Sequence, residues 1–160
     1  MLKASRNQRL AEFSSGQARP TALLLGLVFG CGLIIAWMHS LFAVSAYGGL
    51  WALSYFVIYA GACRTCVYYG KKCPIPLEGS CVNNFFEKKA QPFGFLQLFW
   101  ATVAYGLRVI LPLVLIFRYE MIGWGIAYFS LLALFWIIHL RFTGCPNCIN
   151  AQCPLNPDHR

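Results

Sequence analysis

The chain has 160 residues, of which 59% are hydrophobic and only 11% are charged, and its formal net charge is +8. A soluble domain carries roughly 25% charged residues, so the composition excludes an ordinary soluble protein and indicates one that lies in a lipid bilayer. A net positive charge is also typical of nucleic-acid binding, and the placement of the basic residues decides between the two interpretations.

Four apolar segments follow one another along the chain, and each is close to the roughly 20 residues that cross a bilayer as a helix. They cover residues 21–38, 41–62, 93–117 and 121–140. Only His39 and Ser40 separate the first two segments, and only residues 118–120 separate the last two. The sequence therefore predicts an all-α integral membrane protein with four transmembrane helices arranged as two hairpins.

This pattern divides the chain into five parts. They are a basic arm (1–20), a first transmembrane hairpin (21–62), a cysteine-rich loop (63–92), a second hairpin (93–140) and a cysteine-rich tail (141–160). Eleven of the 13 Lys and Arg residues lie in the arm, the loop and the tail. Because Lys and Arg concentrate on the cytoplasmic side, both termini and both cysteine-rich parts are predicted to face the cytoplasm, across a prokaryotic cytoplasmic membrane. This placement explains the positive charge with the lipid bilayer as partner and without nucleic acid.

Two similar cysteine motifs follow the two hairpins. The loop contains GACRTCVYYGKKCPIP (61–76), and the tail contains GCPNCINAQCPLNP (144–157). In each, a C-x-x-C is followed by a third cysteine that directly precedes proline. A hairpin followed by a motif thus occurs twice, which indicates a tandem repeat about a pseudo-twofold axis along the membrane normal. On such an axis the two motifs would meet.

The seven cysteines outside the first span are candidate metal ligands, because the cytoplasm keeps thiols reduced and disfavours disulfides. They are Cys63, Cys66, Cys73, Cys81, Cys145, Cys148 and Cys153. In a joint arrangement, one four-sulfur site takes its ligands from the C-x-x-C pairs of both motifs. In a separate arrangement, the four loop cysteines form one site and the three tail cysteines form another. The fourth ligand of that tail site would be His139, His159 or a non-protein group.

Zinc is the favoured metal, since four thiolates hold it tetrahedrally and it would stabilise a loop too short to fold alone. An iron–sulfur cluster is the second candidate, because a cysteine followed by proline also closes the bacterial ferredoxin motif, although the spacing here differs. Either centre predicts an anchor or electron-transfer subunit of a larger membrane or redox complex. Two alternatives stay open: an enzyme or transporter that handles thiols or soft metal ions, and a passive scaffold shaped by zinc.

Arg108 is the only charged residue within a predicted span. Ionisable residues inside a membrane usually have a functional role. No acidic residue lies in any span, so the sequence offers Arg108 only a partial reach towards Glu120. Two interpretations remain. Arg108 contacts an anion or a quinone head group in a pocket near Tyr105, or its guanidinium is satisfied by tyrosines and backbone carbonyls.

Overall fold

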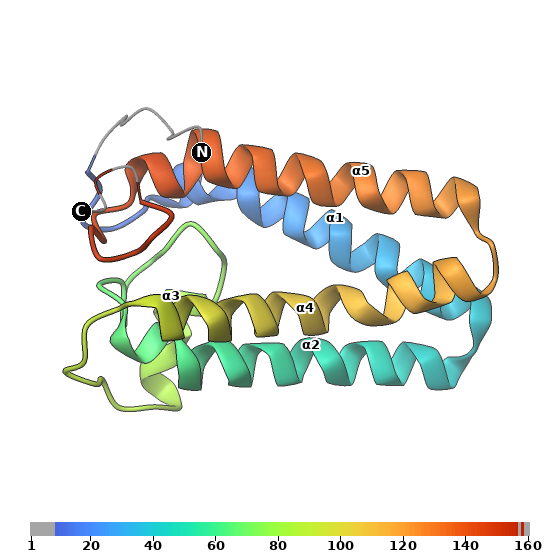
Figure 1. The fold of residues 1–160 in the computed structure, drawn as a ribbon, viewed down its shortest axis with the longest axis horizontal. Helices are drawn as coiled ribbons and strands as arrows, with labels where there is room; N and C mark the ends of the chain where they lie inside the picture. The colour runs from blue at the N-terminus through green and yellow to red at the C-terminus, as the bar shows by residue number, and fades with distance from the viewer. Residues whose placement is uncertain (1–8, 157, 159–160) are drawn as a thin grey trace.

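The computed structural model describes residues 9–156 and 158, so the predictions for Lys3, Arg6, His159 and Arg160 lie outside the described residues. Within them the elements are helical, apart from an isolated bridge between Leu10 and Cys148. Four of the described helices are long and apolar enough to cross a membrane. They are α1 (Ser15–His39), α2 (Leu41–Gly61), α4 (Phe95–Arg118) and α5 (Ile122–Ile138) (Figure 1). The predicted all-α class is confirmed for this part of the chain.

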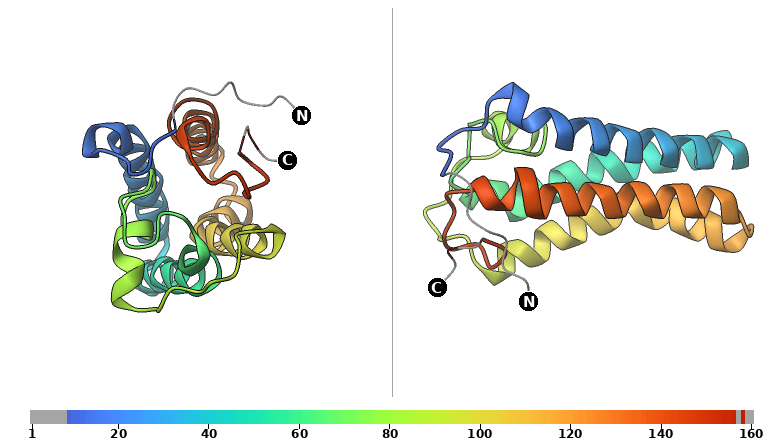
Figure 2. Two further views of the ribbon diagram at one scale, coloured as in Figure 1. Left: turned by 90° about the vertical axis from the view of Figure 1, so that its left-hand side faces the viewer. Right: turned by 90° about the horizontal axis from the view of Figure 1, so that it is seen from above.

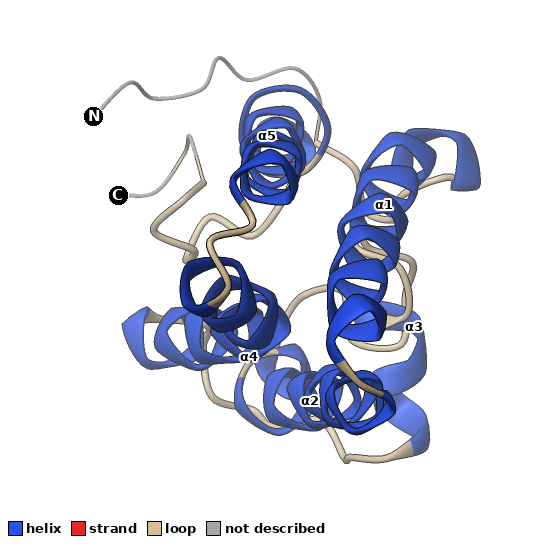
Figure 3. Cartoon of the chain, turned by 90° about the vertical axis from the view of Figure 1, so that its right-hand side faces the viewer, coloured by secondary structure: helices blue, strands red, loops and turns tan. Residues whose placement is uncertain are grey.

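The four long helices form a bundle in which consecutive helices run in opposite directions (Figures 1 and 3). The most extensive packing joins α2 to α4 and α1 to α5, whereas α4 and α5 contact each other only slightly. Each helix of the second predicted hairpin therefore packs mainly on a helix of the first one. The paired-hairpin arrangement is not confirmed by this packing, and the pseudo-twofold repeat stays a prediction.

The first helix begins at Ser15, earlier than the predicted start at residue 21. Ser14 caps it: the Ser14 hydroxyl accepts a hydrogen bond from the Gln17 N–H (3.3 Å), and the Gln17 side chain accepts one from the Ser14 N–H (3.0 Å). This reciprocal capping box stabilises a polar first turn. Hydropathy alone misses such a turn, because it detects only the apolar residues that follow.

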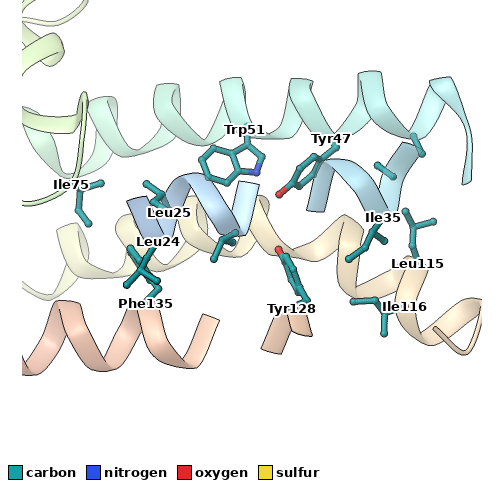
Figure 4. Close-up of a cluster of buried hydrophobic side chains, with 13 residues drawn as sticks. Leu24, Leu25, Ile35, Tyr47, Trp51, Ile75, Leu115, Ile116, Tyr128 and Phe135 are labelled. Atoms are coloured by element: carbon teal, nitrogen blue, oxygen red, sulfur yellow. The ribbon is translucent and has the colours of Figure 1, made fainter. Parts of the chain in front are cut away.

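The core of the bundle is aromatic as well as aliphatic. Tyr47 and Trp51 of α2 and Tyr128 and Phe135 of α5 are all buried, and the side chains of Tyr47 and Tyr128 point towards one another (Figure 4). The outer surface is also apolar, with exposed Leu, Ile and Phe side chains along every long helix. An apolar exterior over helices of this length suits contact with lipid rather than with water.

Both cysteine motifs lie at one end of the bundle, which we call the cysteine end (Figures 1 and 2). The α1–α2 and α4–α5 turns lie at the opposite end. The loop after α2 contains three short helices, η1 (Cys63–Thr65), α3 (Glu78–Cys81) and η2 (Val82–Asn84). After α5 the chain continues as a π-helical turn, η3 (His139–Thr143), which leads into the tail motif. The two motifs share one end because an even number of long helices separates them.

Candidate metal centre

The two C-x-x-C segments adopt the same local structure. Each starts with a 3-10 turn in which the N–H of the second cysteine donates to the carbonyl of the first, at 3.1 Å for Cys66 and 3.3 Å for Cys148. The second cysteine is extended in both, with φ and ψ of −75° and 151° at Cys66 and −76° and 134° at Cys148. The turns are η1 (Cys63–Thr65) and η4 (Cys145–Asn147). Two sulfur atoms on one such turn can converge on a single ion.

The third cysteines, Cys73 and Cys153, also have matching surroundings. Burial, followed by the charge of Glu78, raises the pKa of the Cys73 thiol to about 12, and a backbone hydrogen bond from Ile75 opposes the shift. Burial likewise raises the pKa of Cys153, against a backbone hydrogen bond from Leu155. Ile75 and Leu155 both stand two positions after their cysteine. In both C-P segments the sulfur thus lies against the backbone two positions further on, and the Cys73 thiol donates to the Ile75 carbonyl at 3.0 Å.

Six of the seven predicted ligands line one cavity of about 260 Å³ at the cysteine end. They are Cys63, Cys66, Cys73, Cys145, Cys148 and Cys153. Burial raises the pKa of Cys66 to about 12, and the tail thiols Cys148 and Cys153 contribute to this rise. The loop and tail cysteines are therefore electrostatic neighbours. Cys81, the seventh candidate, does not line this cavity.

The thiols surround the cavity without closing on a common point. Within residues 9–156 and 158, no group of three His, Cys, Asp or Glu side chains is placed so that it could hold a metal ion. All eight cysteines are among these residues, and no disulfide joins any two of them. The chemistry of the lining, with six thiols and a mostly apolar wall, fits a soft metal or an iron–sulfur cluster.

His139 lines the same cavity from η3. Its ring stacks on Phe135 of α5, with centroids 5.8 Å apart and an interplanar angle of 10°. Its Nδ1 atom is buried and has no hydrogen-bond partner among the described residues. Gly144 packs against the ring, and a Cβ at that position would overlap it. The fold therefore holds a buried, unpaired imidazole nitrogen close to the tail motif.

The N-terminal arm connects the two motifs, which the sequence analysis did not anticipate. The Leu10 N–H donates to the Asn147 carbonyl of the tail (2.9 Å), and the Tyr68 hydroxyl of the loop donates to the Leu10 carbonyl (2.7 Å). The same hydroxyl accepts a hydrogen bond from the Ile149 N–H (3.1 Å). Phe13, which is 1% exposed, packs on the Tyr68 ring. In the sequence, the only indication of this contact was Phe13, an isolated aromatic residue in a polar arm.

Arg108 has a carboxylate partner, contrary to the expectation that only Glu120 was within reach. The partner is Glu78 at the start of α3, whose Oε1 lies 3.0 Å from Nη2 of Arg108. The pair is buried, with residue exposures of 1% for Arg108 and 6% for Glu78. Nε of Arg108 donates to Ser54 of α2 (2.9 Å), and the Tyr105 hydroxyl donates to Glu78 (3.2 Å). The acid comes from the loop rather than from a span, so a search of the spans could not find it.

Aromatic rings enclose the guanidinium. The Arg108 Cζ lies 4.5 Å from the ring centroid of Tyr55, 4.7 Å from that of Tyr105 and 5.1 Å from that of Trp51. Such cation–π contacts stabilise a desolvated cation by about 2 kcal/mol at buried sites. Burial raises the pKa of Glu78, and the charge of Arg108 opposes this shift. The ion pair joins the loop to α2 and α4, directly beside the thiol-lined cavity, which Glu78 also lines.

The raised pKa values of the buried thiols predict that Cys66 and Cys73 react slowly with alkylating reagents. With pKa values of about 12, the Cys66 and Cys73 thiols are roughly 10⁻⁴ ionised at pH 8, against about a quarter for a free cysteine. Because the thiolate is the nucleophile, iodoacetamide should modify both in the metal-free protein about a thousandfold more slowly than after denaturation. The rate should rise about tenfold per pH unit above 8. Mass spectrometry of alkylated peptides measures it, and modification at the free-cysteine rate would contradict the prediction.

Comparison with protein families, with curated proteins and with solved structures finds no match to this chain.

Proposed function

We propose that this protein holds a metal centre through cysteines of both motifs and acts as a membrane-embedded anchor or electron-transfer subunit of a larger complex. The observation that carries the proposal is the single cavity lined by six cysteines from segments about 80 residues apart in sequence. It supports the joint arrangement, with Cys63, Cys66, Cys145 and Cys148 as the four ligands. Cys73, Cys153 and His139 line the same space without being ligands in this arrangement, whereas Cys81 is outside it.

The four apolar helices support the membrane part of the proposal. Arg64, Lys71, Lys72 and Arg141 lie on the loop and tail side of these helices, whereas Arg118 ends α4 at the opposite end. The positive-inside rule therefore favours a cytoplasmic cysteine end, as proposed from sequence. A metal centre there would meet soluble partners or another subunit at the membrane surface.

Zinc is the favoured occupant, because two C-x-x-C turns supply the four thiolates of a closed structural site. An iron–sulfur cluster is the second candidate, and the cavity volume favours it. About 260 Å³ is several times the roughly 30 Å³ that a water molecule occupies, so the space exceeds the need of one ion. With zinc the centre would fix the loop and tail for a partner. With a cluster it would carry electrons.

The alternative of a thiol enzyme has less support. A nucleophilic cysteine needs a lowered pKa and access to solvent, whereas burial raises the pKa values of Cys66, Cys73 and Cys153. Buried, protonated thiols are inert until a metal displaces their protons. The handling of a soft metal ion as cargo remains compatible with the same lining.

Metal analysis of two variants tests the proposal. The protein is purified without oxygen, and zinc, iron and acid-labile sulfide are measured per chain in wild type, Cys66→Ser and Cys148→Ser. We expect one centre per chain in the wild type and almost complete loss in both variants, because each removes a ligand from the same site. Cys81→Ser is the matched control and should retain the metal.

The stoichiometry separates the two ligand arrangements. Two centres in the wild type, of which each variant removes one, would support separate sites. Iron with sulfide would identify a cluster, and zinc alone a structural ion. Metal-free protein from an anaerobic preparation, with no uptake of either metal, would overturn the proposed function.

A further inference from the structure

A second cavity, of about 250 Å³, lies between α4 and α5 next to Arg108. Its floor comes from Val28 of α1 and Trp51 of α2, and its sides from α4 and α5. Three residues that line it, Thr102 and Gly106 of α4 and Trp136 of α5, are exposed on the outer surface of the bundle. A Cβ at Gly106 would meet no atom within 4 Å. Because α4 and α5 contact each other so little, the cavity opens sideways to the region that lipid occupies.

Arg108 forms part of the inner wall of this cavity and has unused hydrogen-bond donors. Its Nε donates to Ser54 and its Nη2 lies 3.0 Å from Glu78 Oε1, but neither Nη1 nor Nη2 has a hydrogen-bond partner among the described residues. Arg108 is 1% exposed, and an unsatisfied donor at such a depth is costly. The residue lies about 20 Å along α4 from its start at Phe95, at a rise of 1.5 Å per residue. That depth is beyond the ester groups of lipids at the membrane surface.

Electrostatics select the kind of acceptor that fits this donor. Glu78 already neutralises Arg108, so an added carboxylate or phosphate would lie beside the Glu78 charge in a medium that screens poorly. A neutral carbonyl oxygen accepts the hydrogen bond without that repulsion. Apart from Thr102, whose hydroxyl donates to the Leu98 carbonyl, the other lining side chains are aliphatic or aromatic, including Phe135 and Trp136, and suit a flat ring. The volume is below the roughly 300–1,000 Å³ of drug-sized sites, which fits a head group of one ring.

We propose that the α4–α5 cavity binds a lipid-soluble quinone, with one quinone carbonyl accepting a hydrogen bond from Arg108 Nη1. The isoprenoid or alkyl tail of such a ligand leaves through the opening beside Gly106 and Trp136. From the sequence, an anion or a quinone head group was expected as a ligand of Arg108. The proposal selects the quinone head group, which is neutral.

The quinone cavity adjoins the thiol-lined cavity. Thr102, Tyr105 and Trp136 line both. A ring at Arg108 would therefore lie one layer of side chains from the thiol-lined cavity. This adjacency gives an electron-transfer centre at the cysteines a membrane-soluble partner, although quinone binding itself does not depend on which metal the cysteines hold.

A plug at the opening tests the site without altering Arg108. Decylubiquinone is titrated into detergent-solubilised protein as purified, and quenching of tryptophan fluorescence reports binding, since Trp51 and Trp136 line the cavity. We expect saturable quenching in the wild type and at least tenfold weaker binding in Gly106→Leu. Gly49→Leu is the matched control, because Gly49 is equally open but lies on α2 away from the cavity, and its affinity should stay within twofold of wild type. Infrared difference spectra should show the bound carbonyl band shifted to lower frequency by the hydrogen bond.

Three results would overturn the inference. The first is an affinity in Gly106→Leu equal to that of the wild type, and the second is the absence of saturable quenching in the wild type. The third is tighter binding of dodecanoate than of the quinone, which would indicate an anion site. Because the readout is fluorescence of the protein as purified, failure of quinone binding and failure of the metal centre are separate observations.

Discussion

Replacing Arg108 with methionine is expected to lower the free energy of unfolding by about 3–5 kcal/mol, the usual cost of removing one partner from a buried ion pair. Glu78 would remain buried and unpaired, since its Oε1 faces Nη2 of Arg108 at 3.0 Å. Ser54 would lose its donor and three aromatic rings would lose their cation. Unfolding of the detergent-solubilised protein, followed by circular dichroism during titration with a denaturing detergent, measures the loss.

Two further variants identify the ion pair as the cause. Glu78→Leu combined with Arg108→Met removes both charges, and most of the lost stability should return, because a buried pair replaced by apolar groups of similar size is often neutral. Arg118→Met removes a charge from the exposed end of α4 and should change stability by less than about 0.5 kcal/mol. A double variant no more stable than Arg108→Met alone would contradict the assignment.

Tyr68→Phe is expected to detach the tail motif from the loop motif. The Tyr68 hydroxyl donates to the Leu10 carbonyl and accepts a hydrogen bond from the Ile149 N–H, and Tyr68 is only 3% exposed. Removing the hydroxyl takes away both of these hydrogen bonds to backbone groups, at a cost of about 2 kcal/mol. Since each 1.4 kcal/mol is a factor of ten, the Ile149 amide should exchange with deuterium about thirtyfold faster. Hydrogen-exchange mass spectrometry of a peptide that covers residues 145–153 measures this.

Tyr69→Phe provides the comparison from the adjacent residue. The Tyr69 hydroxyl donates to the Phe86 carbonyl at 2.7 Å, so this variant also loses one hydroxyl hydrogen bond. Tyr69 and Phe86 both belong to the loop, so the exchange rate of the tail peptide should stay as in wild type. Equal acceleration in the two variants would mean that Tyr68 has no special part in joining the motifs.

Much of the fold could be predicted from sequence because its signals are local. Runs of about 20 apolar residues identify the four long helices, and the turns at Ser40 and at 119–121 follow from the short polar gaps. Packing could not be predicted in this way. All four helices are apolar on most faces, so hydropathy does not specify whether α2 packs mainly on α1 or on α4. The contact at Gly61, where a Cβ would overlap Trp100 of α4, depends on shapes that a sequence pattern does not give.

Only part of the candidate site could be predicted from the sequence. C-x-x-C spacing identifies the cysteines, and the same local turn at Cys63 and Cys145 follows from the shared spacing. The exclusion of Cys81 from the cavity depends on the path of the chain through residues 74–80, which no motif describes. That path includes Leu77 with a positive φ of 68°, held by a hydrogen bond from the Tyr59 hydroxyl to its carbonyl. It directly precedes Glu78, whose pairing with Arg108 was missed for the same reason.

The hydrogen bonds of Leu10 also set an order of events during synthesis. Leu10 leaves the ribosome well before Asn147, whose carbonyl accepts a hydrogen bond from the Leu10 N–H. Domains form in the order in which their residues emerge, so the helices can insert well before this closure. The arm can join loop and tail only after residue 147 has been made. Closure of the cysteine end is therefore expected to follow insertion of the helices, and chains that terminate before residue 147 would lack the contact that joins the arm to the tail.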